Sequence, residues 1–191
     1  DESRAGLAFI NQQLAENENQ LALSGVRPYI ALVARFDPSK GMPNAMAAYA
    51  LAREKMLRRG LAMARIPQLL IVGNGSADDP DGVPVLSEIM RLRSSTYRHI
   101  MDDVKVARVP ANDIAINAVV HNSKLIIQPS TKEGFESRVT DAILQGKPVI
   151  GSRRGGIPLQ IVSGRSGFVI DPEDTDAWAE HMCELMVNDV Y

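Results

Sequence analysis

Residues 125–150 read in succession as a strand, a loop, a helix and a second strand. The short apolar run 125–128 is typical of a strand that is covered on both faces. A polar, glycine-containing loop follows, and from residue 139 to residue 146 the apolar side chains recur at helical spacing. The run 148–150 is apolar again. A strand joined through a helix to a further strand is the unit of a parallel sheet, so this segment predicts buried strands covered by helices.

The same alternation extends over most of the chain. Segments with helical spacing separate further apolar runs that are typical of buried strands, at 28–34, 68–72, 104–109 and 167–170. About six rounds of strand and helix, with no internal repeat, predict a Rossmann-like, doubly wound α/β domain whose parallel sheet has about six strands. We expect residues 1–26 to form an entry helix and a linker, and residues 27–191 to form the domain.

The composition argues against several classes of partner. The chain has 191 residues, 45% of them hydrophobic, and a formal net charge of −2. Proteins that bind nucleic-acid phosphates usually carry a basic excess, so we expect no nucleic-acid partner. No apolar run approaches the length of a membrane span, and no secretory signal pattern stands at the N-terminus, so we expect no membrane association and a cytoplasmic location. A single cysteine permits no internal disulfide, which favours a reducing compartment.

The sequence carries no clear metal or dinucleotide signature. The three histidines and Cys183 share no spacing that is typical of metal ligands, so we expect no metal site. Gly73 and Gly75 lack the third glycine and the following acid of a dinucleotide-binding fingerprint, and they read as a tight turn.

Charged residues follow two of the predicted strands, at the edge of the sheet where doubly wound folds bind ligands. Arg35 and Lys40 lie between the first strand and its helix, where cations beside a helix N-terminus favour phosphate. Two surface cations near a turn are the alternative. Glu133 lies in the loop after the strand at 125–128, and Asp141 lies about two helical turns further on and points away from the sheet. Glu133 could instead cap the helix that follows it.

These residues resemble the motifs of a known family. Glu133-Gly-Phe-Glu136, followed by an acid at position 141, is similar to the Glu-x7-Glu donor-binding signature of retaining GT-B glycosyltransferases of family 4, the glycogen-synthase and sucrose-synthase type. Asp141 stands where that signature has the longer Glu. Gly146-Lys-Pro-Val-Ile150 and Gly155-Gly-Ile-Pro158 extend the likeness.

A wider set of segments resembles the C-terminal, donor-binding domain of fungal-type trehalose phosphorylases and of the related trehalose-synthesising glycosyltransferases. Glu136 after Gly-Phe, where Gly is commoner, favours this subfamily. The resemblance covers almost the whole chain from about Gly6 and implies that the chain is one half of a GT-B fold. The segments that carry it are 27–30, 34–41, 109–113, 130–136, 146–150 and 155–160.

The resemblance also implies roles for individual residues. Glu133 would be the catalytic residue, stabilising charge near the reacting carbon rather than attacking it. Arg35 and Lys40 would hold the donor's phosphate, and Asp141 would correspond to the acid that binds a nucleotide's ribose. The glucosyl hydroxyls would be held by Glu133 and by the backbone amides of Gly134, Phe135 and Glu136.

The implied function is a retaining glucosyltransferase of the trehalose phosphorylase type, which converts trehalose and phosphate reversibly to glucose 1-phosphate and glucose. A synthase that uses a nucleoside-diphosphate glucose is the alternative, and a non-catalytic sugar-phosphate-binding or assembly module is an alternative of another class. We expect no cofactor beyond the donor substrate. Because the chain does not begin with Met, we expect a fragment, a processed product or a truncated form of a longer protein. The resemblance implies that the N-terminal acceptor domain is absent and that the isolated chain is inactive. A homodimer stays open.

Overall fold

The computed structural model describes residues 1–74 and 82–187, so Gly75 of the predicted turn lies outside the described residues. Most of the described residues belong to helices or strands that alternate along the chain. In chain order the elements are α1 (Glu2–Glu18), β1 (Tyr29–Val33), η1 (Pro38–Lys40), α2 (Met42–Arg58), η2 (Met63–Arg65), β2 (Gln68–Gly73), α3 (Gly82–Ser94), η3 (Arg98–Ile100), β3 (Val104–Arg108), α4 (Asp113–Asn122), β4 (Leu125–Gln128), α5 (Ser137–Leu144), β5 (Val149–Ser152), α6 (Ile157–Gln160), β6 (Gly167–Ile170) and α7 (Thr175–Val187).

The strands form one sheet in the order β3-β2-β1-β4-β5-β6, and every neighbouring pair is parallel. The chain builds the sheet from β1 outwards to β3, then returns to place β4 on the other side of β1. The strand order therefore reverses between β1 and β4, where Ile30 lies opposite Leu125. This arrangement confirms the Rossmann-like, doubly wound fold that the sequence predicts.

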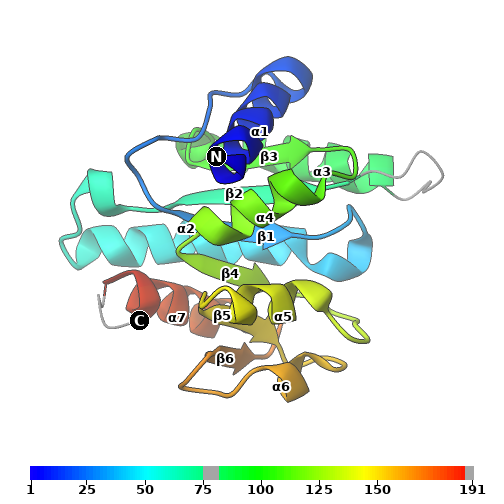
Figure 1. The fold of residues 1–191 in the computed structure, drawn as a ribbon. Coiled ribbons are helices and arrows are strands. Elements are labelled where there is room, and N and C mark those ends of the chain that lie inside the picture. The colour runs from blue at the N-terminus through cyan, green and yellow to red at the C-terminus, as the bar shows by residue number, and fades with distance from the viewer. Residues whose placement is uncertain (75–81, 188–191) are drawn as a thin grey trace.

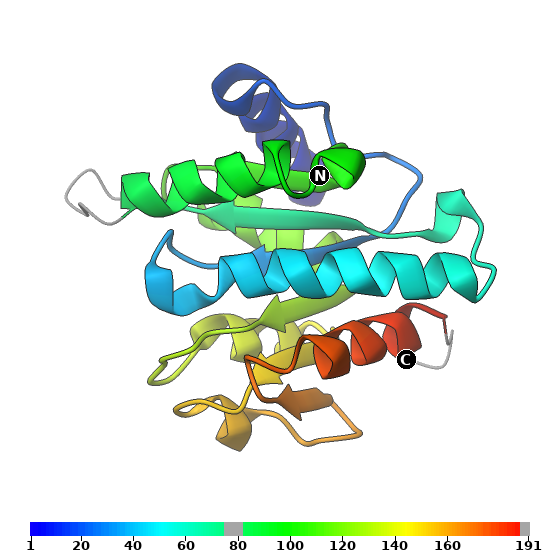
Figure 2. The same cartoon turned by 180° about the vertical axis from the view of Figure 1, so that it is seen from behind.

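Side chains alternate between the two faces of the sheet and build a core on each face. Ile30 and Leu32 of β1 belong to the core beneath α2, α3 and α7. Ala31 and Val33 belong to the core beneath α1, α4 and α5. Figure 1 shows α1, α4 and α5 in front of the sheet, and Figure 2 shows α2, α3 and α7 from the opposite side. Because both faces are covered, the strands are apolar along most of their length instead of alternating with polar residues.

The N-terminal helix α1 packs on the sheet and on α4. Ile10 and Leu14 are fully buried in the core that they share with α4. Gly6 lets the two helices approach closely, because a Cβ at this position would lie 2.5 Å from the Cβ of Ala118. Beyond the helix, the side-chain amide of Gln20 forms two hydrogen bonds with the backbone of β3. The division of the chain at residue 26 stays a prediction.

Asp103 joins three segments at the amino edge of the sheet. Its carboxylate pairs with Arg27 at 2.5 Å and with Arg53 at 2.8 Å. Burial opposes the charge of Asp103, but the hydrogen bonds from the two guanidinium groups outweigh burial and lower its pKa. An acid with a lowered pKa in the folded state contributes stability above its ordinary pKa of about 3.9. That stability is lost as the pH falls through the folded pKa.

An Asp103→Asn variant is expected to be about 2 kcal/mol less stable than the wild type at neutral pH, because two partly buried guanidinium groups lose their charged partner. The difference should shrink as the pH falls through the lowered pKa of Asp103. Urea unfolding of both proteins at several pH values measures it. Asp102→Asn changes an exposed neighbour and is the matched control. A loss of stability that stays constant with pH would contradict the ion-pair explanation.

Candidate functional site

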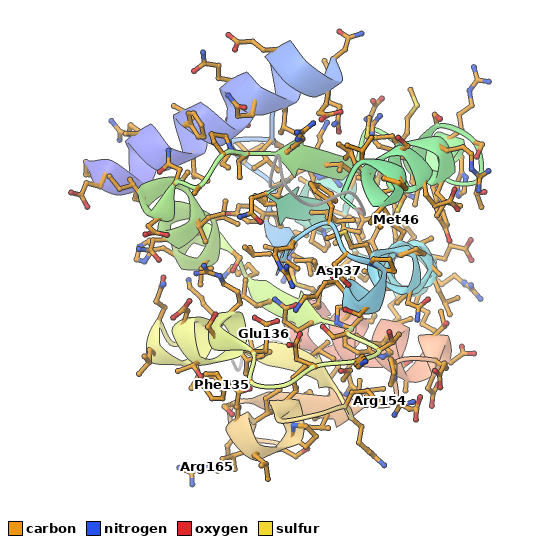
Figure 3. All side chains as sticks on the ribbon, turned by 90° about the vertical axis from the view of Figure 1, so that its right-hand side faces the viewer. Asp37, Met46, Phe135, Glu136, Arg154 and Arg165 are labelled. Carbon is orange, nitrogen blue, oxygen red and sulfur yellow. The ribbon has the colours of Figure 1, made fainter. Side chains whose placement is uncertain are left out.

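A cavity of about 270 Å³ opens at the carboxyl edge of the sheet, where β1, β2 and β3 end and where α4 and α5 begin. Figure 3 looks onto this edge, with Asp37 and Glu136 near the centre of the view. Doubly wound folds bind ligands at this edge, beside the point where the strand order reverses. The charged residues that line the cavity are Arg35, Lys40, Asp113, Glu136 and Arg138.

The first loop of the site contains the short helix η1. Asp37 caps η1, because its carboxylate accepts hydrogen bonds from the backbone N–H and the hydroxyl of Ser39 at 2.8 and 2.5 Å. Gly41 turns the chain into α2 with a φ of +65°, and a Cβ there would lie 2.1 Å from the carbonyl oxygen of Pro129. The backbone N–H of Thr131 donates to the carbonyl oxygen of Ser39 at 2.7 Å. Backbone contacts therefore fix η1 against the loop that follows β4.

Lys40 lies between two carboxylates at this edge. Its side chain is only 10% exposed, and its ammonium group donates to Glu133 and, at 3.0 Å, to Glu136. The hydroxyl of the buried Ser130 donates to the same oxygen of Glu133 at 3.3 Å, and the backbone N–H of Gly134 donates to the other oxygen at 3.1 Å. The fold thus brings a buried cation into contact with carboxylates that lie 93 and 96 positions further along the chain.

The charges of these three groups depend on one another. Burial opposes the charge of Lys40, but the hydrogen bonds to Glu133 and Glu136 outweigh burial and raise its pKa. Burial also opposes the charge of Glu133, yet the hydrogen bond from Lys40 prevails and lowers the pKa of Glu133. At Glu136 burial prevails and raises the pKa. Lys40 therefore stays protonated, and Glu133 is the stronger acid of the two carboxylates.

Glu136 is held by α5 and by α6. It is the N-cap of α5, because its carboxylate accepts from the backbone N–H of Arg138 at 3.2 Å. The alternative in which Glu133 caps this helix is therefore wrong. The side-chain oxygen of Gln160 accepts from the Glu136 N–H at 3.1 Å, and its nitrogen donates to the Glu136 carbonyl at 2.9 Å. The same nitrogen donates to the hydroxyl of Thr140 at 2.8 Å.

The loop that carries Glu133 rests against two glycines that follow β5. A Cβ at Gly155, where φ is +57°, would lie 1.7 Å from the carbonyl oxygen of Glu133. The backbone N–H of Gly156 donates to the carbonyl oxygen of Gly134 at 2.7 Å, and a Cβ on Gly156 would lie 2.6 Å from that oxygen. The motif Gly155-Gly-Ile-Pro158 thus provides the close backbone approach that fixes this loop.

The two arginines that line the cavity differ in how they are paired. The side chain of Arg35 is 61% exposed, and it lies 4.0 Å from Asp37, so its charge is accessible to a ligand. Arg138 forms an ion pair with Asp141 at 2.9 Å within α5. Asp141 does not belong to the described lining of the cavity. Arg35 is consequently the more available of the two cations.

The structure brings Arg35, Lys40, Glu133 and Glu136 to one edge, as their positions after two strands predict. The side chain of Phe135 is 70% exposed, and the residues outside the described cavity lining are Glu133, Gly134, Phe135 and Asp141. The binding and catalytic roles of all seven residues stay predictions. Sequence reasoning missed two contributors, Arg138 and Gln160. Gln160 ends the segment 155–160 that carries the resemblance, but a neutral amide in a sequence does not indicate that it positions a site residue.

Three other features of the described residues bear on function. Within residues 1–74 and 82–187, no group of three or more His, Cys, Asp or Glu side chains is arranged to hold a metal ion. None of the helices in this part of the chain combines the length and the hydrophobicity that crossing a membrane requires. Cys183 is a free, buried thiol in α7.

The chain belongs to the family described as Glycosyl transferases group 1, whose model matches residues 27–188. A trehalose phosphorylase of Grifola frondosa is 41% identical over 181 residues, which cover 95% of this chain and 24% of that protein. A trehalose synthase of Thermococcus litoralis is 36% identical over 171 residues, which cover 84% of this chain and 37% of that protein. These relatives confirm the resemblance that the sequence motifs suggest. The chain spans only about a quarter to a third of their length.

A solved structure agrees with this assignment. The sucrose-phosphate synthase of Thermosynechococcus elongatus superposes with a TM-score of 0.65 at 24% sequence identity. The superposition covers 95% of this chain and 41% of that chain. At this level of identity the likeness concerns the fold alone, and it confirms the Rossmann-like α/β fold.

Proposed function

We propose that this chain is the donor-binding domain of a retaining glucosyltransferase of the trehalose phosphorylase type. The observation that carries the proposal is the cluster of Lys40, Glu133 and Glu136 beside a cavity that Arg35 also lines. A buried cation with an accessible second cation suits a phosphate group, and a carboxylate next to them suits sugar hydroxyls and positive charge. The 41% identity to a trehalose phosphorylase over nearly the whole chain supports this choice of substrate.

The proposed reaction transfers a glucosyl group between glucose and phosphate. A phosphate oxygen forms a bond to the anomeric carbon of trehalose while the bond from that carbon to the second glucose breaks. The proton of the phosphate passes to the departing oxygen, which gives glucose 1-phosphate and glucose. Lys40 and Arg35 hold the phosphate, and Glu133 stabilises the positive charge that develops on the anomeric carbon.

A nucleoside-diphosphate glucose is the second candidate donor, because the trehalose synthase of Thermococcus litoralis is also similar over most of this chain. Asp141, the expected ribose contact, already pairs with Arg138. That ion pair engages one oxygen of a partly exposed carboxylate, so the other oxygen can still accept from a ribose hydroxyl. We favour phosphate and glucose 1-phosphate as the substrates, because the trehalose phosphorylase is the more similar of these two relatives.

The remaining parts of the proposal concern the whole protein. The relatives are longer than this chain, which supports an N-terminal acceptor domain that completes the active site and an isolated domain without turnover. We propose that the reaction needs no cofactor beyond the donor. A cytoplasmic location and a homodimer stay predictions.

An NMR titration of the 191-residue chain with glucose 1-phosphate, phosphate and UDP-glucose in parallel tests the proposal. We expect saturable shifts of the backbone amides of residues 35–41 and 133–138 with glucose 1-phosphate. UDP-glucose should bind no more tightly than glucose 1-phosphate. The amides of α1, at the far edge of the sheet, are the internal control. Tighter binding of UDP-glucose with a response at Asp141 would favour the synthase. No shift with any of the three compounds would contradict a donor site and favour an assembly module that binds no sugar phosphate.

A further inference from the structure

Two carboxylates share one lysine in the candidate site. If Glu133 and Glu136 were both ionised, the cluster with Lys40 would carry a net negative charge at the place where a phosphate would bind. The side chain of Glu133 is 13% exposed and that of Glu136 is 9% exposed, so water screens this charge poorly. An incoming dianion would then be repelled by the same groups that hold the lysine. A proton on one of the two carboxylates would remove this repulsion, while Arg35 and Arg138 on the cavity wall attract the anion in either state.

The hydrogen bonds indicate which carboxylate carries that proton. Glu133 accepts from Lys40, from the hydroxyl of Ser130 and from the backbone N–H of Gly134. Among the described residues Glu136 accepts from Lys40 and from the backbone N–H of Arg138, and a hydrogen bond to Glu133 favours its neutral form. More donors stabilise the ionised form of Glu133, and deeper burial favours the neutral form of Glu136. The raised pKa of Glu136 and the lowered pKa of Glu133 agree with this assignment.

We propose that the site binds the donor's phosphate with Glu136 protonated, so that Glu136 donates a hydrogen bond to a phosphate oxygen beside Lys40. The inference rests on the proposed function, and it says which protonation state of the site binds phosphate. Glu136 lines the cavity, contacts Lys40 and caps the start of α5. The charged groups around it are Lys40 after β1, Glu133 before α5, Arg138 in α5, Arg35 on the cavity wall and Asp113 at the start of α4.

A neutral Glu136 makes phosphate binding depend on pH. As the pH rises through the pKa of Glu136, the free site loses its proton, and binding must then take up a proton from solution. The apparent Kd of a dianion is expected to weaken by up to tenfold for each pH unit above that pKa. A glutamine at position 136 donates a hydrogen bond at every pH, so it should bind the dianion without this dependence.

The experiment measures sulfate binding to the 191-residue chain between about pH 6 and about pH 9, because the charge of sulfate is constant in this range. Wild type, Glu136→Gln and the exposed control Glu88→Gln are compared by the amide shifts of residues 35–41 and 133–138. We expect Kd to weaken with pH in the wild type and in Glu88→Gln, and to stay constant in Glu136→Gln. An equal pH dependence in all three proteins, or a loss of sulfate binding in folded Glu136→Gln, would overturn the inference.

Calorimetry of the wild type provides a test that does not require the variant to fold. Titrations with sulfate and with glucose 1-phosphate at about pH 8, in two buffers with different heats of ionisation, give the number of protons taken up. We expect an uptake above zero and up to about one proton for each anion bound. Binding without proton uptake would overturn the role of Glu136 and leave the phosphate site intact. A chain that binds neither anion would contradict the proposed function as well.

Discussion

A Lys40→Ala variant of the full-length protein is expected to lose about 10²- to 10³-fold in kcat/KM for trehalose phosphorolysis, or about 3–4 kcal/mol of transition-state stabilisation. Lys40 is the buried cation of the site, and the proposed phosphate would lose its strongest partner. Glu133 and Glu136 would lose the ammonium group that both of them bind, and this loss would favour the neutral form of Glu136 further. Initial rates of glucose 1-phosphate formation measure the loss.

Two substitutions control for this experiment. Lys40→Arg keeps the charge, but a planar guanidinium group cannot replace a compact ammonium group between two carboxylates, so we expect an intermediate rate. Lys132→Ala removes an exposed lysine that directly precedes Glu133, and its rate should equal that of the wild type. Thermal unfolding of each variant separates a folding defect from a catalytic defect. A folded Lys40→Ala protein with a rate within a few-fold of the wild type would contradict the phosphate-binding role.

A Gly155→Ala variant is expected to be less stable than the wild type by about 3 kcal/mol. The new Cβ would meet the carbonyl oxygen of Glu133 at 1.7 Å, and the φ of +57° strains any residue that has a side chain. The loop that carries Glu133 must move to relieve the contact, so the catalytic rate should fall together with the stability. Urea unfolding and initial rates of the same preparation measure both effects.

Gly60→Ala is the matched control for Gly155→Ala. Gly60 also has a positive φ, of +82°, but a Cβ there would have no atom within 4 Å. It therefore reports the backbone strain alone, about 1–2 kcal/mol, without displacing any loop of the site. Equal losses of stability at positions 60 and 155 would show that the contact with Glu133 is unimportant.

The fold could be predicted from the sequence because most of the strands are buried on both faces. Apolar runs such as 29–33 and 68–72 have no polar side to place in solvent, so only a sheet covered by two layers of helices can accommodate them. The alternation with helical segments then requires parallel strands. The first residue of a helix depends on local contacts, such as the hydrogen bond by which the side chain of Asn112 caps α4.

The site could be predicted only in part. Lys40 and Glu133 were expected at one edge because parallel strands all end on the same side of a sheet. The contact between Lys40 and two carboxylates depends on the register of β1 with β4 and on the packing of Gly41 against Pro129, neither of which a local pattern contains. Gln160 was missed because it acts on the backbone of Glu136 from a distant segment.

The packing of Gly41 on Pro129 and of Gly155 on Glu133 limits how this domain can be re-engineered. Three segments, 37–41, 129–136 and 155–160, fit together through their main chains, so the path of the central segment depends on glycines in the other two. If segment 129–136 were replaced by that of a relative with a different donor preference, the new main chain would meet Gly41 and Gly155, which fit the original segment. A working chimera therefore has to exchange all three segments as one unit, and natural changes of donor should leave coordinated substitutions in the same three places.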